Sequence, residues 1–300
     1  MKGKKKPLVS VVVTTYNRKE MLKITIKSIL NQTYDNLELL IIDNYSNYDF
    51  FNFISSFNDS RIKAFQNKNN GIIAVNRNYG INKSIGNYIA FCDDDDYWDK
   101  FKLSDQIKFF KNEKVILVSS LALKIGKSTS FLSSNYGFLY PFINLEYSSF
   151  LKTNPIVLSS VLICNDTIKS INGFSENPNI FAVEDHDLFI RLYKKGQFII
   201  LNRFHVNYRI HDNNFSENNV MDKIRSNKML ELRNLKLVNS KISFYKKIIN
   251  HFRNTFVYIL IKNFVLFLVI IKIKTFTFLS NYFNNDFLYI NSKSYLNKDH

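Results

Sequence analysis

The first half of the chain alternates between short apolar runs and longer stretches with helical spacing. Apolar runs of strand length cover residues 8–16, 37–43, 61–67 and 87–93, and helix-like stretches cover residues 19–32, 48–57 and 74–86. Strands that alternate with helices predict βαβ units, and near-continuous apolar strands are typical of a sheet that is covered on both faces. The pattern therefore predicts an α/β fold with a mostly parallel central sheet flanked by helices.

Polar side chains follow three of these four predicted strands. Residues 14–17 (Thr-Thr-Tyr-Asn) end the first strand, Asp43 and Asn44 end the second, and residues 93–96 end the fourth. Ligands of parallel α/β sheets bind beyond the carboxyl ends of the strands, so we expect these side chains to form one polar rim. Short carboxylates and amides can accept hydrogen bonds from a base or a ribose, and the ring of Tyr16 can stack on a base.

Four consecutive aspartates, residues 93–96 in "FCDDDDYWDK", stand at the last of these strand ends. Such a run is a solvated acidic loop, a helix cap or a cation site. Its place after a buried strand, with Trp98 closing the turn, favours the cation site. Asp93 and Asp95 alternate along the strand and so point to the same side, where a hard divalent cation could take their oxygens together with those of a diphosphate. Arg77, in the helical stretch before the run, is placed to meet phosphate oxygens.

A second acidic pair stands at the start of "VEDHDLFIRLYKKG", residues 183–196. Leu188, Phe189 and Leu192 fall on one helical face, which places Glu184 and Asp185 at the amino end of the predicted helix. Acids at a helix start cap it and complement its dipole, so a purely structural role is the alternative to a catalytic one.

Four segments, in this order, resemble glycosyltransferase family 2. Residues 7–46 resemble the family's opening, residues 76–98 its Asp-x-Asp metal segment, residues 157–196 its acceptor side, and residues 208–216 the end of its catalytic domain. The resemblance covers roughly residues 7–216. It implies the Rossmann-like GT-A fold and an enzyme that moves a sugar from a nucleotide-diphosphate donor, here a UDP-sugar, to an acceptor hydroxyl.

The resemblance also implies a role for each matching position. The residues implied in nucleotide-sugar binding are Thr14, Tyr16, Asp43, Asn44, Arg77, Asp93 and Asp94. The implied metal ligands are Asp93, Asp95, Asp96 and His211, and the implied catalytic pair is Asp185, as the base, with Glu184 beside it. Asn44 stands where the family often has a second aspartate, so the identity of the donor's nucleobase stays open. Asp94 fills the variable place of the motif, so we expect it to be the dispensable member.

The chemistry of the reaction agrees with these roles. A divalent cation, Mn²⁺ or Mg²⁺, neutralises charge on the departing diphosphate, and a carboxylate on the opposite side takes the acceptor proton. One base and one cation site suffice for a single displacement, which inverts the anomeric centre. We expect the product to be a surface polysaccharide, lipopolysaccharide or capsule. The loops near residues 125–155, where the sugar would be selected, carry no readable pattern.

Three alternatives remain. A nucleotidyltransferase usually needs a Gly-rich basic loop early in the chain, and "TTYNRKE" is not one. A catalytically inactive relative is consistent with Asn44. A basic module that binds nucleic acid or membrane accounts for the net charge of +16, but it leaves the aspartates unexplained because they would repel phosphates. We therefore expect a nucleotide sugar and a glycan or lipid-linked glycan as partners, and no nucleic acid.

The two ends of the chain suggest where the protein acts. The basic start runs into apolar residues 8–13 without a small-residue cleavage site, so we favour a first strand over a secretory signal. Residues 217–300 predict a basic, apolar, helical extension beyond a catalytic domain of residues 1–216. Its longest uncharged apolar run, residues 263–271, is shorter than the roughly 20 residues that span a bilayer. It fits an anionic membrane surface, or equally a helix packed on protein.

Only two cysteines occur, Cys92 and Cys164, and both lie in apolar runs. This placement favours buried reduced thiols over a disulfide, which indicates a cytosolic protein. Together with the extension, it predicts a cytoplasmic enzyme that is peripheral on the inner face of the cytoplasmic membrane.

Overall fold

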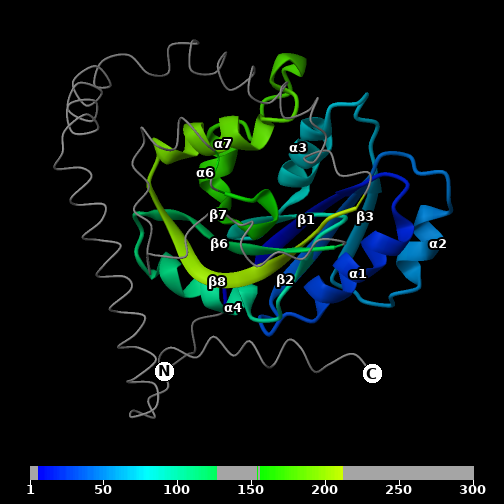
Figure 1. The fold of residues 1–300 in the computed structure, drawn as a ribbon, viewed down its shortest axis with the longest axis horizontal. Coiled ribbons are helices and arrows are strands. Elements are labelled where there is room, and N and C mark those ends of the chain that lie inside the picture. The colour runs from blue at the N-terminus through cyan, green and yellow to red at the C-terminus, as the bar shows by residue number, and fades with distance from the viewer. Residues whose placement is uncertain (1–5, 127–153, 155, 212–300) are drawn as a thin grey trace, which may run out of the picture. The chain divides into compact units, whose positions relative to one another are not determined.

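The computed structural model describes residues 6–126, 154 and 156–211, which form an eight-stranded sheet with helices on both faces (Figure 1). In sheet order the strands are β3 (Ile62–Gln66), β2 (Leu37–Asp43), β1 (Val9–Thr15), β4 (Tyr88–Asp93), β7 (Leu162–Cys164), β6 (Val115–Ile125), β8 (Gln197–Arg209) and β5 (Tyr97–Trp98). Four of the seven pairings are parallel, including all those among β3, β2, β1 and β4. The predicted α/β fold with a mostly parallel sheet is confirmed.

Six α-helices and three short 3₁₀-helices connect the strands within the described residues. The α-helices are α1 (Lys19–Leu30), α2 (Phe50–Ser55), α3 (Ile73–Lys83), α4 (Lys102–Gln106), α6 (Asn165–Ser170) and α7 (Glu184–Tyr193). The 3₁₀-helices are η1 (Ile107–Lys111), η2 (Leu158–Ser160) and η3 (Pro178–Ile180). In Figure 1, α3, α6 and α7 are drawn above the sheet and α1 and α4 below it. The first three helices and four strands lie where the hydrophobic pattern predicts them.

Strand β1 is buried along its whole length because both faces of the sheet are covered. Val11 and Val13 belong to the same core cluster as Ile26 of α1. Val12 points to the other face, where a Cβ on Gly80 of α3 would lie only 2.5 Å from its Cγ1. Glycine at position 80 therefore lets α3 approach the sheet closely enough to bury β1 on its second face.

Helix α7 shows how an apolar stripe positions charged residues. Leu188, Phe189 and Leu192 are buried, as the spacing predicts. This burial determines the rotation of the helix, and the helix begins at Glu184 with Asp185 next to it. The prediction that both acids stand at the amino end of a helix is confirmed.

Both cysteines are free, with Cys92 buried and Cys164 partly buried. No helix in the part of the chain that the structure describes is long and apolar enough to cross a membrane. The C-terminal extension, its boundary at residue 216 and most of the 125–155 loops lie outside the described residues.

Candidate active site

The ends of three parallel strands meet at one edge of the sheet. In the ladders, Thr15 of β1 lies opposite Asp43 of β2, and Thr14 lies opposite Asp93 of β4. The polar residues predicted to form a rim are therefore neighbours at one edge of the sheet. Tyr16 follows directly and is 54% exposed, so its ring is available for stacking.

Asp43 and Asn44 bind neighbouring loops through their side chains. The carboxylate of Asp43 is fully buried and accepts hydrogen bonds from Ser46, at N and Oγ, and from Nε2 of Gln66 at 3.0 Å. Oδ1 of Asn44 accepts from the backbone N–H of Asn69 at 2.9 Å. These bonds stabilise the rim, and a contact of either side chain with a base remains a prediction.

The four aspartates lie in different surroundings. Asp93, Asp95 and Asp96 each offer a carboxylate oxygen within 4.8 Å of the other two. Asp94 lies apart from this cluster: it is 4% exposed and accepts from Thr15 Oγ1 at 2.8 Å and from Arg18 at 2.9 Å. We expected Asp94 to be dispensable, whereas it is a buried acceptor of hydrogen bonds from two side chains, and its removal would take this acceptor from the buried Thr15 hydroxyl.

Burial makes ionisation of this run costly. It raises the pKa of Asp94 to about 6 against the opposing charge of Arg18. The pKa of Asp93 is also raised by burial, although Arg77 lowers it. Burial, followed by the charges of Asp93 and Asp95, raises the pKa of Asp96 well above its ordinary value. The three neighbouring carboxylates of Asp93, Asp95 and Asp96 offer the hard oxygen ligands that a divalent cation prefers, so the cluster can accommodate a cation.

Arg77 connects the cluster to helix α7. Its guanidinium is buried and donates through NH1 to Glu184 at 2.7 Å and through NH2 to Asp93 at 3.1 Å. The sequence indicated a phosphate-binding role for Arg77, whereas both terminal nitrogens contact acids here. Arg77 thus holds Asp93 of the aspartate cluster and Glu184 of helix α7 on the two terminal nitrogens of one guanidinium.

The base candidate Asp185 is held on both carboxylate oxygens. Oδ2 accepts from Nδ2 of Asn154 at 3.0 Å, and Oδ1 accepts from the backbone N–H of His186 at 2.7 Å. The sequence-predicted His211 lies 3.1 Å from Asp95 through Nε2, which places it at the cation cluster.

Four residues that shape the cluster were not predicted from the sequence. Arg18 contacts Asp94 and Asp95, Thr25 Oγ1 donates toward the carbonyls of Asp94 and Asp96, and Ser159 Oγ donates to Asp96. The fourth, Arg209, donates to the carbonyl oxygen of Asp95. In the sequence these residues are ordinary members of helices and strands, and no local signal distinguishes them.

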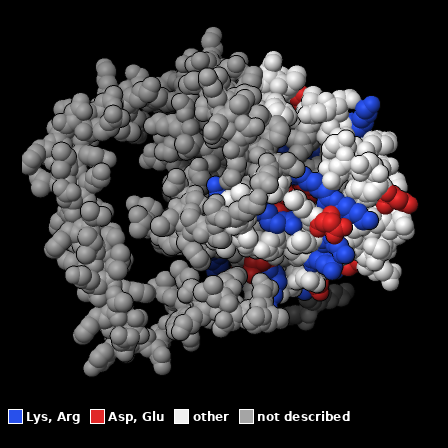
Figure 2. Space-filling view, turned by 45° about the vertical axis from the view of Figure 1, so that its right-hand side comes forward, with Lys and Arg blue, Asp and Glu red and all other residues white. Residues whose placement is uncertain are grey.

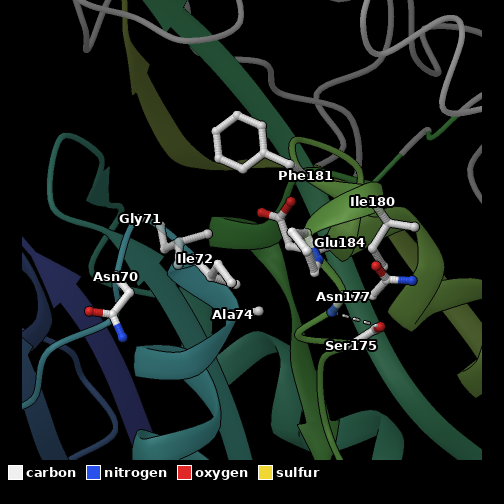
Figure 3. A pocket seen from close by; sticks show the side chains of 11 residues that line it. Asn70, Gly71, Ile72, Ala74, Ser175, Asn177, Ile180, Phe181 and Glu184 are labelled. Carbon is white, nitrogen blue, oxygen red and sulfur yellow. Dashed lines mark hydrogen bonds between the residues drawn. The ribbon is translucent and has the colours of Figure 1, made fainter.

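A pocket of about 360 Å³ opens beside the acidic pair of α7 (Figure 3). Its walls are the loop before α3 with the first residues of that helix, from Asn70 to Ala74, and residues of the segment from Ser175 to Phe181, with Glu184 at one side. In Figure 3 the Glu184 carboxylate is drawn between Ile72 and Phe181. The lining combines apolar side chains with amides and one carboxylate, which suits a polar ligand with an apolar face.

The surface charge is mixed. Figure 2 shows Lys and Arg side chains next to Asp and Glu on one face of the described residues, bordered by uncharged surface. The part of this face that described residues form therefore has no broad patch of one sign.

An α/β sheet with an acidic cluster at its strand ends and a second acidic pair across a buried arginine agrees with the GT-A fold that the sequence resemblance implies. The chain belongs to glycosyltransferase family 2: the profile of Glycosyl transferase family 2 matches residues 10–164. The family resemblance of the sequence is confirmed, and the protein is a glycosyltransferase.

The chain is similar in sequence to the Escherichia coli protein WfaP, named UDP-Glc:alpha-D-GlcNAc-diphosphoundecaprenol beta-1,3-glucosyltransferase. The two are 31% identical over 253 residues, which cover 81% of this chain and 93% of the relative. The match therefore extends through most of the relative.

Two solved structures share the fold. TarS 1–349 of Staphylococcus aureus, in complex with UDP-GlcNAc, aligns with a TM-score of 0.62 at 16% identity, over 78% of this chain and 67% of that one. Mannosyltransferase PcManGT of Pyrobaculum calidifontis, in complex with GDP-Man and Mn²⁺, aligns with a TM-score of 0.50 at 16% identity, over 67% and 55%. At these identities the likeness concerns the fold.

Proposed function

We propose that the protein transfers a sugar from a UDP-sugar to a hydroxyl of a lipid-linked glycan, with inversion and with a divalent cation. The observation that carries the proposal is the contact of Arg77 with both Asp93 and Glu184. Asp93, on the proposed donor side of the site, and Glu184, on the proposed acceptor side, thus contact the same guanidinium.

The acidic cluster fits a hard cation. Three carboxylate oxygens from Asp93, Asp95 and Asp96 lie within 4.8 Å of one another, and burial raises the pKa values of Asp93 and Asp96. Oxygen donors of this type suit Mn²⁺ or Mg²⁺, with His211 next to Asp95 as a further ligand. The bound ion would neutralise negative charge on the departing diphosphate. PcManGT, which shares the fold and was solved in complex with GDP-Man and Mn²⁺, supports this choice.

Asp185 would take the proton of the acceptor hydroxyl. Asn154 and the amino end of α7 orient its carboxylate, and Glu184 is held by Arg77 rather than free to serve as a second nucleophile. A single displacement then inverts the anomeric centre. The pocket beside Glu184 suits the sugar ring of the acceptor, because its amides can bind hydroxyls while its apolar side chains contact the ring face.

The names of the relatives support the substrate class. WfaP uses a UDP-linked sugar and an undecaprenol-diphosphate acceptor, and TarS was solved with UDP-GlcNAc. Tyr16 and the rim around Thr14 and Asp43 would contact the base and ribose. Because Asn44 stands where the family often has an aspartate, the preference for uracil over guanine has to be measured.

The test is a donor and acceptor screen with the purified protein. We expect isothermal titration to detect UDP binding in the presence of Mn²⁺ and weaker binding after chelation. Transfer from a UDP-sugar to a polyprenyl-diphosphate-linked sugar should follow. Absence of metal-dependent binding of both UDP and GDP would rule out the proposal.

A lipid-linked acceptor also implies an enzyme that works at the cytoplasmic face of a membrane. We propose that residues 217–300 provide the contact, through lysines and apolar side chains on an anionic surface. The full chain should sediment with anionic liposomes, and a chain truncated after residue 250 should remain in solution. Equal sedimentation of both would exclude this segment as the anchor.

A further inference from the structure

Arg18 contacts the acidic run through Asp94 and Asp95, and the sequence predicted no role for this arginine. We propose that Arg18 forms an ion pair with Asp95 when no divalent cation is bound, and that it binds the donor diphosphate once Asp95 coordinates the cation. The inference rests on the proposed function, since it requires that the cluster bind a cation and a nucleotide diphosphate.

A single nitrogen of Arg18 makes both of its ion pairs. NH1 lies 2.9 Å from Oδ1 of Asp94 and 2.7 Å from Oδ2 of Asp95. Asp95 is one of the three carboxylates that could hold the ion, whereas the Asp94 carboxylate is directed to Thr15 and Arg18. A divalent cation on Asp95 would therefore stand close to the guanidinium, and the two positive charges would repel each other.

The two aspartates differ in how readily they can lose Arg18. The Asp94 side chain is 6% exposed, and an unpaired charge there would be costly. Asp95 would gain a cation in exchange, so it can release the guanidinium without being left unpaired. Arg18 can thus remain with Asp94 while Asp95 changes partner.

Arg18 also has donors to offer a diphosphate. A guanidinium carries five N–H groups, and only NH1 of Arg18 has a partner among the described residues. The side chain is 34% exposed, whereas Arg77 is 7% exposed and has acids on both terminal nitrogens. Of these two arginines, Arg18 is therefore the one with Nε and NH2 available for phosphate oxygens, in the fork geometry that suits them.

The exchange predicts effects of opposite sign on two affinities. In Arg18→Met, Mn²⁺ alone should bind about 3–10-fold more tightly, because no fixed cation competes for Asp95. UDP in the presence of Mn²⁺ should bind roughly 10–100-fold more weakly, because a charge-assisted contact with the diphosphate is lost. Electron paramagnetic resonance of free Mn²⁺ measures the first affinity, and isothermal titration of UDP at saturating Mn²⁺ measures the second.

Three variants separate this exchange from other causes. Lys23→Met, at an exposed lysine of α1, the helix that follows Arg18, removes the same charge away from the cluster and should change neither affinity. Arg18→Met/Asp94→Asn removes both charges of the ion pair together and leaves no uncompensated carboxylate at Asp94, which keeps the experiment interpretable if the single variant unfolds. Arg18→Lys keeps the charge without the fork, so it should bind Mn²⁺ as the wild type does and UDP more weakly.

Both affinities unchanged, or both weakened together, would show that Arg18 only supports the fold and would overturn the inference. That result differs from failure of the proposed function, in which the wild-type protein itself would bind neither Mn²⁺ nor UDP.

Discussion

Arg77 illustrates how a single residue organises the site. Its guanidinium is buried, and burial alone would lower its pKa, but the charges of Asp93 and then Glu184 and Asp185 raise it. The arginine therefore stays charged at any pH at which the fold is stable. A permanent positive charge between Asp93 and Glu184 lowers the repulsion between these two acids and lets them lie close together.

The single substitution Asp185→Asn tests whether Asp185 is the catalytic base. Asparagine keeps the size of the side chain and an acceptor oxygen, but it cannot take a proton. We expect UDP binding with Mn²⁺ to remain unchanged while kcat falls roughly 10²–10⁴-fold. Titration calorimetry and a transfer assay measure the two quantities.

The matched control for this variant is Asp166→Asn, which makes the same change in the first turn of α6 at an exposed position. It should keep full activity. Full activity of Asp185→Asn as well would place the base at another residue.

Among the elements, η2 connects the cation cluster to α4. Ser159 of η2 donates from Oγ to Asp96, and its carbonyl accepts from Nε1 of Trp98 at 2.8 Å. Lys102 of α4 is fully buried, donates to Gln106 at 2.9 Å and to the Val161 carbonyl at 3.2 Å, and lies 4.0 Å from the Trp98 ring. The position of Asp96 therefore depends on packing that lies behind the site.

Lys102 predicts a pH dependence of stability. Burial lowers the pKa of Lys102 to about 7, against an ordinary value of 10.5. Between these values the unfolded chain binds more protons than the folded one, so this lysine makes the free energy of unfolding rise with pH. The contribution is up to about 1.4 kcal/mol per pH unit. Below pH 7 the lysine is protonated in both states, and its full destabilisation is present.

Urea denaturation at pH 7, 8, 9 and 10 checks this dependence. Lys102→Met should lose the part of the slope that Lys102 contributes, and Lys111→Met, an exposed lysine of η1, should keep the wild-type slope. The same slope in Lys102→Met as in the wild type would contradict the prediction.

In the whole molecule, ligand binding and folding are linked through the rim. The strand ends of β1, β2 and β4, helix α7 and strand β8 all contribute to the site, and they belong to one sheet and its covering helices. A donor bound with its cation would contact several of these elements in the folded chain and none of them together in the unfolded chain. Binding must therefore stabilise the fold.

We expect UDP with Mn²⁺, at about 100 times the dissociation constant, to raise the free energy of unfolding by about 2.7 kcal/mol. For a domain of this size the shift in Tm should be about 5–10 °C. Thermal denaturation with UDP and Mn²⁺, and again after chelation with EDTA, measures it. An equal shift with EDTA present would mean that the nucleotide binds without the cation, and GDP serves as the control for the base.

The predicted elements were correct where local pattern decides structure. Strands β1 and β2 are continuous apolar runs because both faces are covered, and α7 has its apolar stripe because one face is buried. The ends of such elements are also local properties. Hence the polar rim, the aspartate run and the acids at the start of α7 could all be predicted from the order of residues along the chain.

The hydrogen-bond and ion-pair partners of individual side chains could not be predicted from the sequence in this way. The hydrogen bond of Arg77 with Glu184 joins residues 107 positions apart, and that of Arg18 with Asp95 joins residues 77 apart. Which distant strands become neighbours depends on the sheet order, where β4 pairs with β7 and β7 with β6. A one-dimensional pattern of polar and apolar residues does not encode this order.

The sequence alone thus predicted the fold class from periodicity and the acidic candidates from their places at strand and helix ends, and the resemblance of four segments indicated the glycosyltransferase family. Only the folded sheet separated Asp94 from the other aspartates, turned Arg77 toward two acids and brought Arg18 onto Asp95. Ion pairing depends on distances of a few ångströms between residues remote in the chain, and tertiary packing alone sets those distances.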